Sequence, residues 1–268
     1  LEAALTDRTR VVATVHASNA VGTVNPVGRI AEMAHAVGAY HVVDAVQSAP
    51  HVPLDVQAIG CDFLLCSAYK FFGPHLGVMY GRADLLESLP VYKVRPAKDA
   101  APYRWETGTL AFESIAALGA ALEYLAQIGR ANIDSCAAAF PGFAGERLEF
   151  KCAMETIRQY EAGLVTRLLE VLARMPDVKV YGITDIERLE ERCPTVVFTH
   201  GRYTADEIAD YLAVQHVYVW SGHYYAVEIM DRLGHPEDGM LRVGLSHYNT
   251  AAEVDRFGDV LSGFLGGA

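Results

Sequence analysis

The chain has 268 residues and a mass of 29.2 kDa, and its residues are 51% hydrophobic, 10% aromatic and 21% charged. This composition is typical of a globular protein with a buried core, and it excludes disorder, collagen-like repeats and coiled coil. A formal net charge of −11 repels phosphate backbones and anionic lipids, so we expect neither nucleic acid nor a membrane as a partner.

Cysteine usage and the start of the chain predict a cytoplasmic protein. The five cysteines show no CxxC pair and no zinc-ligand spacing, and most lie among apolar residues, as reduced thiols do. The first ten residues, LEAALTDRTR, carry charges where a secretory signal is apolar. Because the chain starts with Leu and a strand-like run follows at once, we expect it to be truncated at its N-terminus.

The first half of the chain alternates short apolar runs with helical segments. Residues 11–16 form a continuous apolar run, as expected of a strand buried on both faces, and similar runs follow at 40–44 and 62–66. An Asn-Pro pair at 25–26 predicts the start of a helix, and Gly38 predicts its end. Strands and helices joined by short links predict a mainly parallel α/β sheet.

The second half has a different pattern. An Ala/Gly-rich stretch at 130–150 predicts a linker, and a long amphipathic helix follows it. Antiparallel-type strands and helices begun by capping boxes, such as the one at Thr204, predict a smaller α+β domain. We therefore expect a large parallel-sheet domain at 1–135, and a linker with a small domain at 136–268.

Polar residues follow two of the predicted strands, where α/β enzymes keep their reactive groups. Asp44 ends one strand and Gln47 lies one turn beyond it, while Ser67 and Lys70 follow the next strand. Lys70 stands between an apolar strand and two phenylalanines, so partial desolvation is expected to favour its neutral, imine-forming amine. A carboxylate on the neighbouring strand would keep a pyridinium nitrogen protonated, and a serine hydroxyl would donate to a phosphate.

Each of these residues also has an ordinary interpretation. A single lysine after a strand is usually a solvated surface charge, and a single aspartate there is usually a turn or cap residue. Ser67 taken alone carries no information. The residues by themselves leave both interpretations open.

Four segments resemble, in order, the class V aminotransferases and cysteine desulfurases. They are HASNAVGTVNPV, the stretch from VDAVQSAP to SAYKFFGPHLGVMYGR, RWETGTLAFESIAALGAALEYLAQIG, and LRVGLSHYNTAAEVDRF. Together they extend over nearly the whole chain. The resemblance implies an enzyme of fold type I that uses pyridoxal 5'-phosphate (PLP), with an incomplete, mainly parallel large domain and a smaller C-terminal α+β domain.

The resemblance also implies a role for each matching position on the cofactor side. Lys70 would form an imine with the cofactor and move the proton at the substrate Cα, while Asp44 would pair with the pyridine nitrogen. Gln47 would hydrogen-bond the phenolic oxygen of the ring.

The phosphate would be bound by Ser67, helped by Thr109 from the second subunit of a homodimer. Tyr69 stands where relatives often have histidine before the lysine, and its phenol would also reach the phosphate.

On the substrate side, the resemblance places Asn19 near the substrate and the ring oxygen. Arg242 would hold the substrate carboxylate as a bidentate fork, although an arginine in a strand is otherwise usually a surface charge. His223 is expected in a loop that lines the substrate side. The aromatic cluster at 220–225 is compatible with a substrate pocket and equally with ordinary packing.

One departure from the family argues against cysteine desulfuration. VWSGHYYAVEIM resembles the desulfurase segment that carries the persulfide-forming cysteine, and Tyr225 stands at the matching position. No cysteine follows Cys193, whereas sulfur abstraction needs a thiolate near the substrate. We therefore expect transamination, epimerisation or elimination at the α-amino group of an amino acid. The alternative is a non-catalytic relative or an inactive fragment with a structural or regulatory role.

A second departure concerns the cofactor itself. In the family, a segment ahead of residue 1 supplies a phosphate-binding turn and an aromatic residue that stacks on the ring. We therefore expect the 268 residues alone to bind PLP weakly. Other signals are missing: the chain has no GxGxxG fingerprint, no nucleophile elbow, and no HxxxH or HExxH spacing among its ten histidines, so no metal site is expected.

Overall fold

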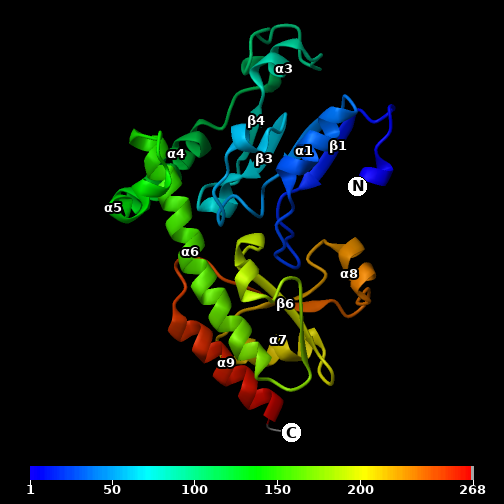
Figure 1. Cartoon of the computed structure of the whole chain (residues 1–268), viewed down its shortest axis with the longest axis vertical. Coiled ribbons are helices and arrows are strands. Elements are labelled where there is room, and N and C mark those ends of the chain that lie inside the picture. Colours follow the sequence, from blue (N-terminus) through cyan, green and yellow to red (C-terminus); the bar gives the residue numbers. More distant parts are fainter. Residues whose placement is uncertain (267–268) are drawn as a thin grey trace. The chain divides into compact units, whose positions relative to one another are not determined.

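The computed structural model describes residues 1–266, and its contacts divide the chain into two compact units (Figure 1). Unit 1 comprises Leu1–His16 and Asn25–Ala153, and unit 2 comprises Ala17–Val24 and Met154–Ala268. The short segment 17–24 therefore leaves unit 1 directly after the first strand, and the chain then returns to unit 1.

The boundary between the units falls inside one long helix, α6 (Gly145–Ala173), at residues 153 and 154. The predicted linker is partly helical as well, because α5 (Ile133–Cys136) lies within it. The division at 135 and 136 stays a prediction about domains, and the contact units differ from it in position and in the exchanged segment.

Unit 1 is built on a four-stranded sheet with the order β1-β2-β3-β4. Its strands are β1 (Val11–Val15), β2 (Tyr40–Asp44), β3 (Phe63–Ser67) and β4 (Gly77–Gly81). The first three strands are parallel, and β4 pairs antiparallel with β3. The mainly parallel α/β sheet expected from the sequence is confirmed.

The other helices of unit 1 are α1 (Val27–Ala36), α2 (Val56–Ile59), α3 (Ala83–Ser88) and α4 (Phe112–Ala131). Short 3-10 turns occur at Glu2–Ala4, Ala68–Phe71, Tyr103–Trp105 and Ala137–Ala139 in this unit, and at Ile186–Glu191 in unit 2. The predicted cap of α1 is wrong, because the Asn25 amide donates to the Val15 carbonyl at 2.8 Å and leaves the helix start without a side-chain cap.

The two faces of this sheet differ in burial. Val12, Val43 and Leu64 are buried in the apolar clusters that form beside α1 and α2. On the opposite face Val11 and Val15 are 54% and 41% exposed. The expectation that the first strand is buried on both faces is therefore wrong.

Unit 2 contains a second four-stranded sheet, in the order β5-β6-β8-β7, whose neighbours are all antiparallel. Its strands are β5 (Val178–Tyr181), β6 (Thr195–His200), β7 (Trp220–Gly222) and β8 (Met240–Gly244). The helices after α6 are α7 (Ala205–Val214), α8 (Val227–Leu233) and α9 (Ala251–Gly266). The α+β character expected of the C-terminal half is confirmed.

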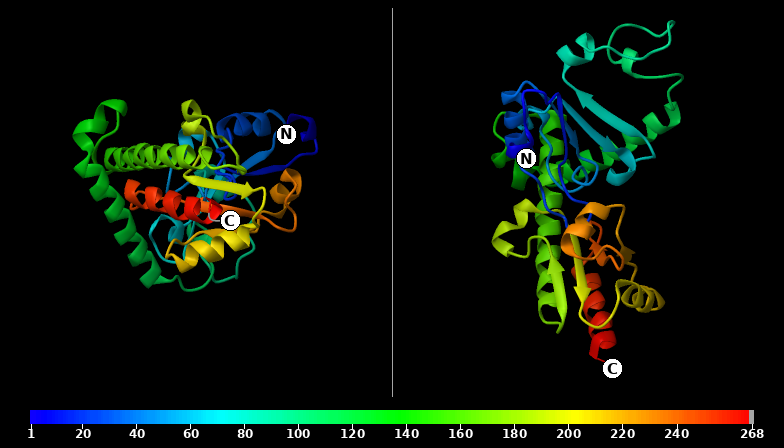
Figure 2. Two further views of the ribbon diagram at one scale, coloured as in Figure 1. Left: turned by 90° about the horizontal axis from the view of Figure 1, so that it is seen from below. Right: turned by 90° about the vertical axis from the view of Figure 1, so that its right-hand side faces the viewer.

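Each face of the second sheet is covered by different elements. Phe198 and Leu241 point into a core shared with α7, α9 and the C-terminal half of α6, which runs beside α9 (Figures 1 and 2). Val197 and Met240 face the other way, toward segment 17–24 and α8. In strands, neighbouring residues alternate between faces, so Arg242 lies on the side of segment 17–24. Within residues 1–266, no helix is long and apolar enough to cross a membrane.

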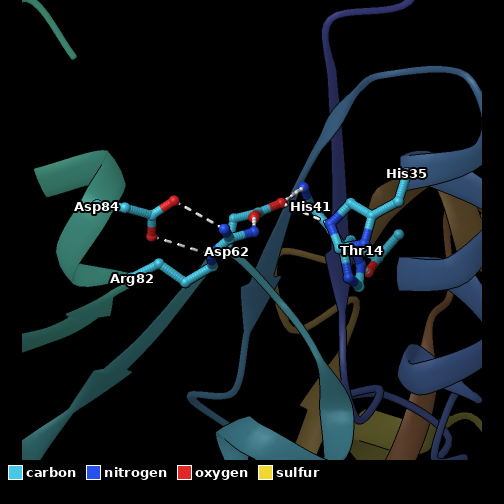
Figure 3. A network of polar contacts seen from close by, with 6 residues as sticks. All are labelled: Thr14, His35, His41, Asp62, Arg82 and Asp84. Carbon is cyan, nitrogen blue, oxygen red and sulfur yellow. Dashed lines mark hydrogen bonds and ion pairs between the residues drawn. The ribbon is translucent and has the colours of Figure 1, made fainter. Parts of the chain in front are cut away.

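A buried carboxylate joins the elements at the amino-terminal edge of the first sheet (Figure 3). Asp62 is 1% exposed and accepts a 2.7 Å hydrogen bond from the His41 backbone N–H. The His35 Nε2 and the Arg82 guanidinium each lie 2.9 Å from its carboxylate oxygens. Arg82 also forks onto Asp84 at the start of α3. Burial alone would raise the pKa of the Asp62 carboxyl, but these hydrogen bonds lower it below its usual value.

We predict that Asp62→Asn lowers the free energy of unfolding by about 2–3 kcal/mol at pH 7, because the partners of this buried carboxylate lose a charged acceptor. The folded-state pKa lies below the unfolded-state value of about 4. The stabilisation is therefore complete above that value and is lost as the pH falls through the folded-state pKa. Urea unfolding of both proteins should show the difference at pH 7 and a smaller difference at acid pH. An unchanged difference would contradict this role for the Asp62 charge.

Candidate functional site

The cofactor-side candidates gather at the carboxyl edge of the first sheet. Asp44 is the last residue of β2 and pairs in register with Leu65 of β3. Ser67 is the last residue of β3, and Lys70 lies in the 3-10 turn that follows. Parallel strands end at the same edge, so the carboxylate, the hydroxyl and the amine come from adjacent loops.

Asp44 is exposed, and its Oδ1 accepts a 2.9 Å hydrogen bond from the Val46 N–H, which holds the carboxylate at the strand end. Burial, together with the negative charge of Asp44, raises the pKa of the Cys66 thiol on β3. The negative charge of Asp44 therefore acts on a side chain of β3, the strand that leads to Lys70. Gln47 lies half-buried in the turn after β2.

Lys70 is exposed, in contrast to the partial desolvation expected from the sequence. Its Nζ lies 5.0 Å from the centroid of the Tyr69 ring, and that ring stacks on His75 with centroids 4.7 Å apart. The Ser67 hydroxyl has no hydrogen-bond partner among the described residues, so it is available to a ligand. Thr109 is exposed.

His16 belongs to the same edge and was missed by sequence reasoning. It follows β1 directly, and its N–H donates to the Asp44 carbonyl at 2.7 Å. Its Nδ1 lies 3.0 Å from the Ser48 hydroxyl, and burial lowers the pKa of its imidazole. Its place in the sequence could have indicated it, because His16 follows the first strand just as Gln47 and Lys70 follow the next two.

The substrate-side candidates lie in unit 2 and centre on Arg242 of β8. Its Nη1 donates to the Asn19 carbonyl at 2.9 Å. Its guanidinium carbon lies 4.5 Å from the centroid of the Tyr224 ring and 5.1 Å from that of Trp220. Burial lowers the pKa of this guanidinium. The structure therefore brings Asn19 and Arg242 into contact.

The loop after β7 presents its residues in two directions. Tyr224 is buried, its hydroxyl donates to the Met240 carbonyl, and its own carbonyl accepts from the Asn19 amide at 2.9 Å. His223 is exposed, and its Nδ1 accepts from the Tyr225 N–H at 3.0 Å. Tyr225 is 91% exposed, so the position that matches the desulfurase cysteine faces solvent in this chain.

Segment 17–24, which carries Asn19, is fastened to unit 2 by backbone bonds. The Cys193 N–H donates to the Gly22 carbonyl, and the Val24 N–H donates to the Glu191 carbonyl, each at 2.8 Å. Between those anchors Arg192 is buried and donates to the Thr195 carbonyl at 2.7 Å. Burial lowers the pKa of Arg192 to about 10.

The chain matches a known family over nearly all its length. The model for aminotransferase class V matches residues 1–150 and 144–257. A cysteine desulfurase of Cronobacter sakazakii is 32% identical and one of Klebsiella pneumoniae 33% identical, over 96% and 93% of this chain. The match covers 58% and 57% of those proteins, so the chain spans little more than half the length of these relatives.

Solved structures agree with the sequence comparison. An apo cysteine desulfurase from Thermococcus onnurineus superposes with a TM-score of 0.78 and 26% identity, covering 97% of this chain and 60% of that one. The cysteine desulfurase CsdA from Escherichia coli gives a TM-score of 0.75 and 25% identity, covering 96% and 59%.

The chain therefore belongs to the aminotransferase class V family, whose members depend on PLP and have fold type I. The side chains at the carboxyl edge of the first sheet include the types of group that bind PLP. They offer a carboxylate at Asp44, a hydroxyl at Ser67 that makes no cap hydrogen bond within residues 1–266, and an accessible amine at Lys70.

We predict that Gly22→Ala destabilises the fold by more than Gly38→Ala. Both glycines have a left-handed φ, +76° and +75°, so alanine costs about 1–2 kcal/mol at either position. A Cβ on Gly22 would also lie 2.5 Å from the Thr195 carbonyl oxygen, whereas a Cβ on Gly38 meets nothing within 4 Å. Thermal unfolding of the two variants measures the difference, and equal losses would contradict the tight seating of segment 17–24.

Proposed function

We propose that this chain belongs to a PLP-dependent enzyme that acts at the α-amino group of an amino acid. The reaction would be transamination, epimerisation or elimination. The main observation behind the proposal is that Asp44 and Lys70 lie at the same edge of the sheet. Asp44 ends β2, and Lys70 follows β3, the parallel neighbour of β2. Family membership supports the cofactor, and the residues described below support the chemistry.

When bound, PLP supplies an aldehyde and an electron-accepting ring that makes the substrate Cα–H acidic. The Lys70 amine would hold the aldehyde and then remove or return the proton at Cα. The Asp44 carboxylate would keep a proton on the ring nitrogen, and its hydrogen bond from Val46 already orients it. Gln47, one turn further on, would donate to the phenolic oxygen.

The phosphate would be bound by the Ser67 hydroxyl and the Tyr69 phenol. Thr109 is exposed, which supports a role in the site of a second subunit in a homodimer. On the substrate side, Arg242 would bind the carboxylate of the amino acid. Asn19 would lie near the substrate and the ring oxygen, and His223 would line the approach. All five cysteines are free thiols, which supports a cytoplasmic location.

We do not propose cysteine desulfuration by the usual loop cysteine, although the relatives named above are cysteine desulfurases. Tyr225 occupies the matching position, and a phenol is no substitute for a thiolate that attacks sulfur. Burial also disfavours the thiolate at three of the cysteines that are present. It raises the pKa of Cys193 to about 12, and it raises the pKa of Cys61 and of Cys66.

We predict that the protein incubated with PLP gains a visible absorbance band, and that Lys70→Ala abolishes the band and any turnover. Lys179→Ala is the matched control, because its Nζ also lies over a tyrosine ring, at 4.8 Å against 5.0 Å for Lys70. The control should keep the band. If neither this chain nor a longer form that contains it takes up PLP, a non-catalytic relative becomes the better account.

We predict that the PLP-loaded protein releases sulfide from cysteine at least ~100-fold more slowly than it converts its preferred amino acid, because a persulfide-forming thiolate is absent from the loop. Sulfide is measured against keto-acid formation and against loss of optical activity across a panel of amino acids. Sulfide release that persists in a Cys61→Ser, Cys66→Ser double variant and exceeds every other reaction would contradict the prediction.

A further inference from the structure

Two aromatic rings form a corner around Arg242. Trp220 of β7 pairs directly with Arg242 of β8, so both side chains stand on the same face of the sheet. Tyr224 follows β7 and meets the Trp220 ring edge-on, with an angle of 88° between planes and 6.5 Å between centroids. The Arg242 guanidinium carbon lies over both rings, within cation–π distance of each.

The positive charge of Arg242 has no acidic partner in the described part of the chain. Its single hydrogen bond there runs from Nη1 to the Asn19 carbonyl, and no carboxylate lies within 4.0 Å of it. Neither the ring faces nor the carbonyl neutralises the charge of this half-buried guanidinium. Its remaining N–H groups can therefore donate hydrogen bonds to an anion.

The Tyr224 ring is itself held from two sides. Its hydroxyl donates to the Met240 carbonyl, while its backbone carbonyl accepts from the Asn19 amide. Its φ of 53° lies in the left-handed region, which a non-glycine residue adopts only where the surroundings enforce it. Asn19, Tyr224 and Arg242 therefore form a closed set of contacts, in which each residue touches the other two.

We propose that Trp220 and Tyr224 are positioning residues that hold the Arg242 guanidinium so that its unpaired edge receives a carboxylate in plane. The corner covers guanidinium surface that would otherwise meet water, and it limits the rotation of a long side chain. The inference rests on the proposed function. It adds that the preference for a free α-carboxylate, over the corresponding amide or amine, depends on these two rings.

The first test uses a pair of reagents that differ in a carboxylate. Aminooxyacetate and methoxyamine both consume the aldehyde of bound PLP, but only aminooxyacetate carries a carboxylate. In the PLP-loaded protein, the ratio of their rate constants, followed by loss of the visible band, measures carboxylate recognition. We expect Trp220→Leu and Tyr224→Leu each to lower the ratio by about tenfold, in line with the loss of a cation–π contact. The methoxyamine rate should stay the same.

Two controls separate positioning from general structure. Tyr224→Phe keeps the ring and loses only the hydroxyl bond to Met240, so it should lower the ratio by less than Tyr224→Leu does. Tyr218→Leu removes an aromatic residue that is 80% exposed near the same strand, and it should have no effect. Trp220 is itself 54% exposed, so its replacement leaves no large cavity and keeps the test open if Tyr224→Leu fails to fold.

A second test needs no cofactor. The chain has two tryptophans, so Trp105→Phe leaves Trp220 as the only intrinsic tryptophan reporter beside Arg242. Propionate should change its fluorescence with saturation, whereas propionamide should not. In this background Tyr224→Leu should weaken propionate binding about tenfold, and Tyr218→Leu should leave it unchanged.

The inference is overturned if the wild-type reagent ratio equals that of PLP free in solution, or if the ring variants slow both reagents equally. It is also overturned if propionate and propionamide act alike on Trp220. A failure of the proposed function has a different signature, namely no visible PLP band in the wild-type protein. In that case the propionate titration still decides whether the corner presents Arg242 to a carboxylate.

Discussion

Parallel pairing of β2 with β3 is the constraint on which the proposed chemistry depends. This pairing sets Asp44 opposite Leu65. Ser67 at the end of β3 and Lys70 in the following turn therefore lie at the same edge of the sheet as the Asp44 carboxylate. A slip of one residue would turn Asp44 to the other face of the sheet and remove it from the lysine. Two hydrogen bonds stabilise the end of β2. The Val46 N–H donates to the Asp44 carboxylate, and the His16 backbone N–H donates to the Asp44 carbonyl. The acid and the amine are thus placed by backbone pairing, while their side chains remain exposed to a ligand.

The substrate-side candidates, Asn19 and Arg242, are brought together by the backbone contacts of segment 17–24. Segment 17–24 leaves unit 1 after β1, and its backbone is bound to residues 191–195 of unit 2. Gly22 permits that seating because a side chain there would meet the Thr195 carbonyl. Asn19 is thereby carried to Arg242, and β7 contributes the aromatic corner. An early part of the sequence and a late one therefore build one polar cluster.

The sequence predicted the elements well, since apolar runs and capping boxes are local signals. The strands at 40–44 and 63–67 and the capping box at Thr204 were found where residue pattern indicated them. Long-range features were not predictable in the same way. The exposure of Val15 depends on what covers a sheet face, and Asn25 bonds the Val15 carbonyl instead of capping its helix. The corner around Arg242 requires knowledge that β7 pairs with β8, which no local pattern contains.

Lys70 is proposed to capture the cofactor aldehyde, and chemical trapping of the bound cofactor identifies the lysine that does so. The protein is incubated with PLP, the imine is reduced with borohydride, and the digested peptides are analysed by mass spectrometry. The chain has five lysines, and we expect Lys70 to be the principal site of the pyridoxyl group, with much less label on each of the other four. Labelling spread evenly over the lysines, or concentrated on one outside the Asp44 edge, would contradict it.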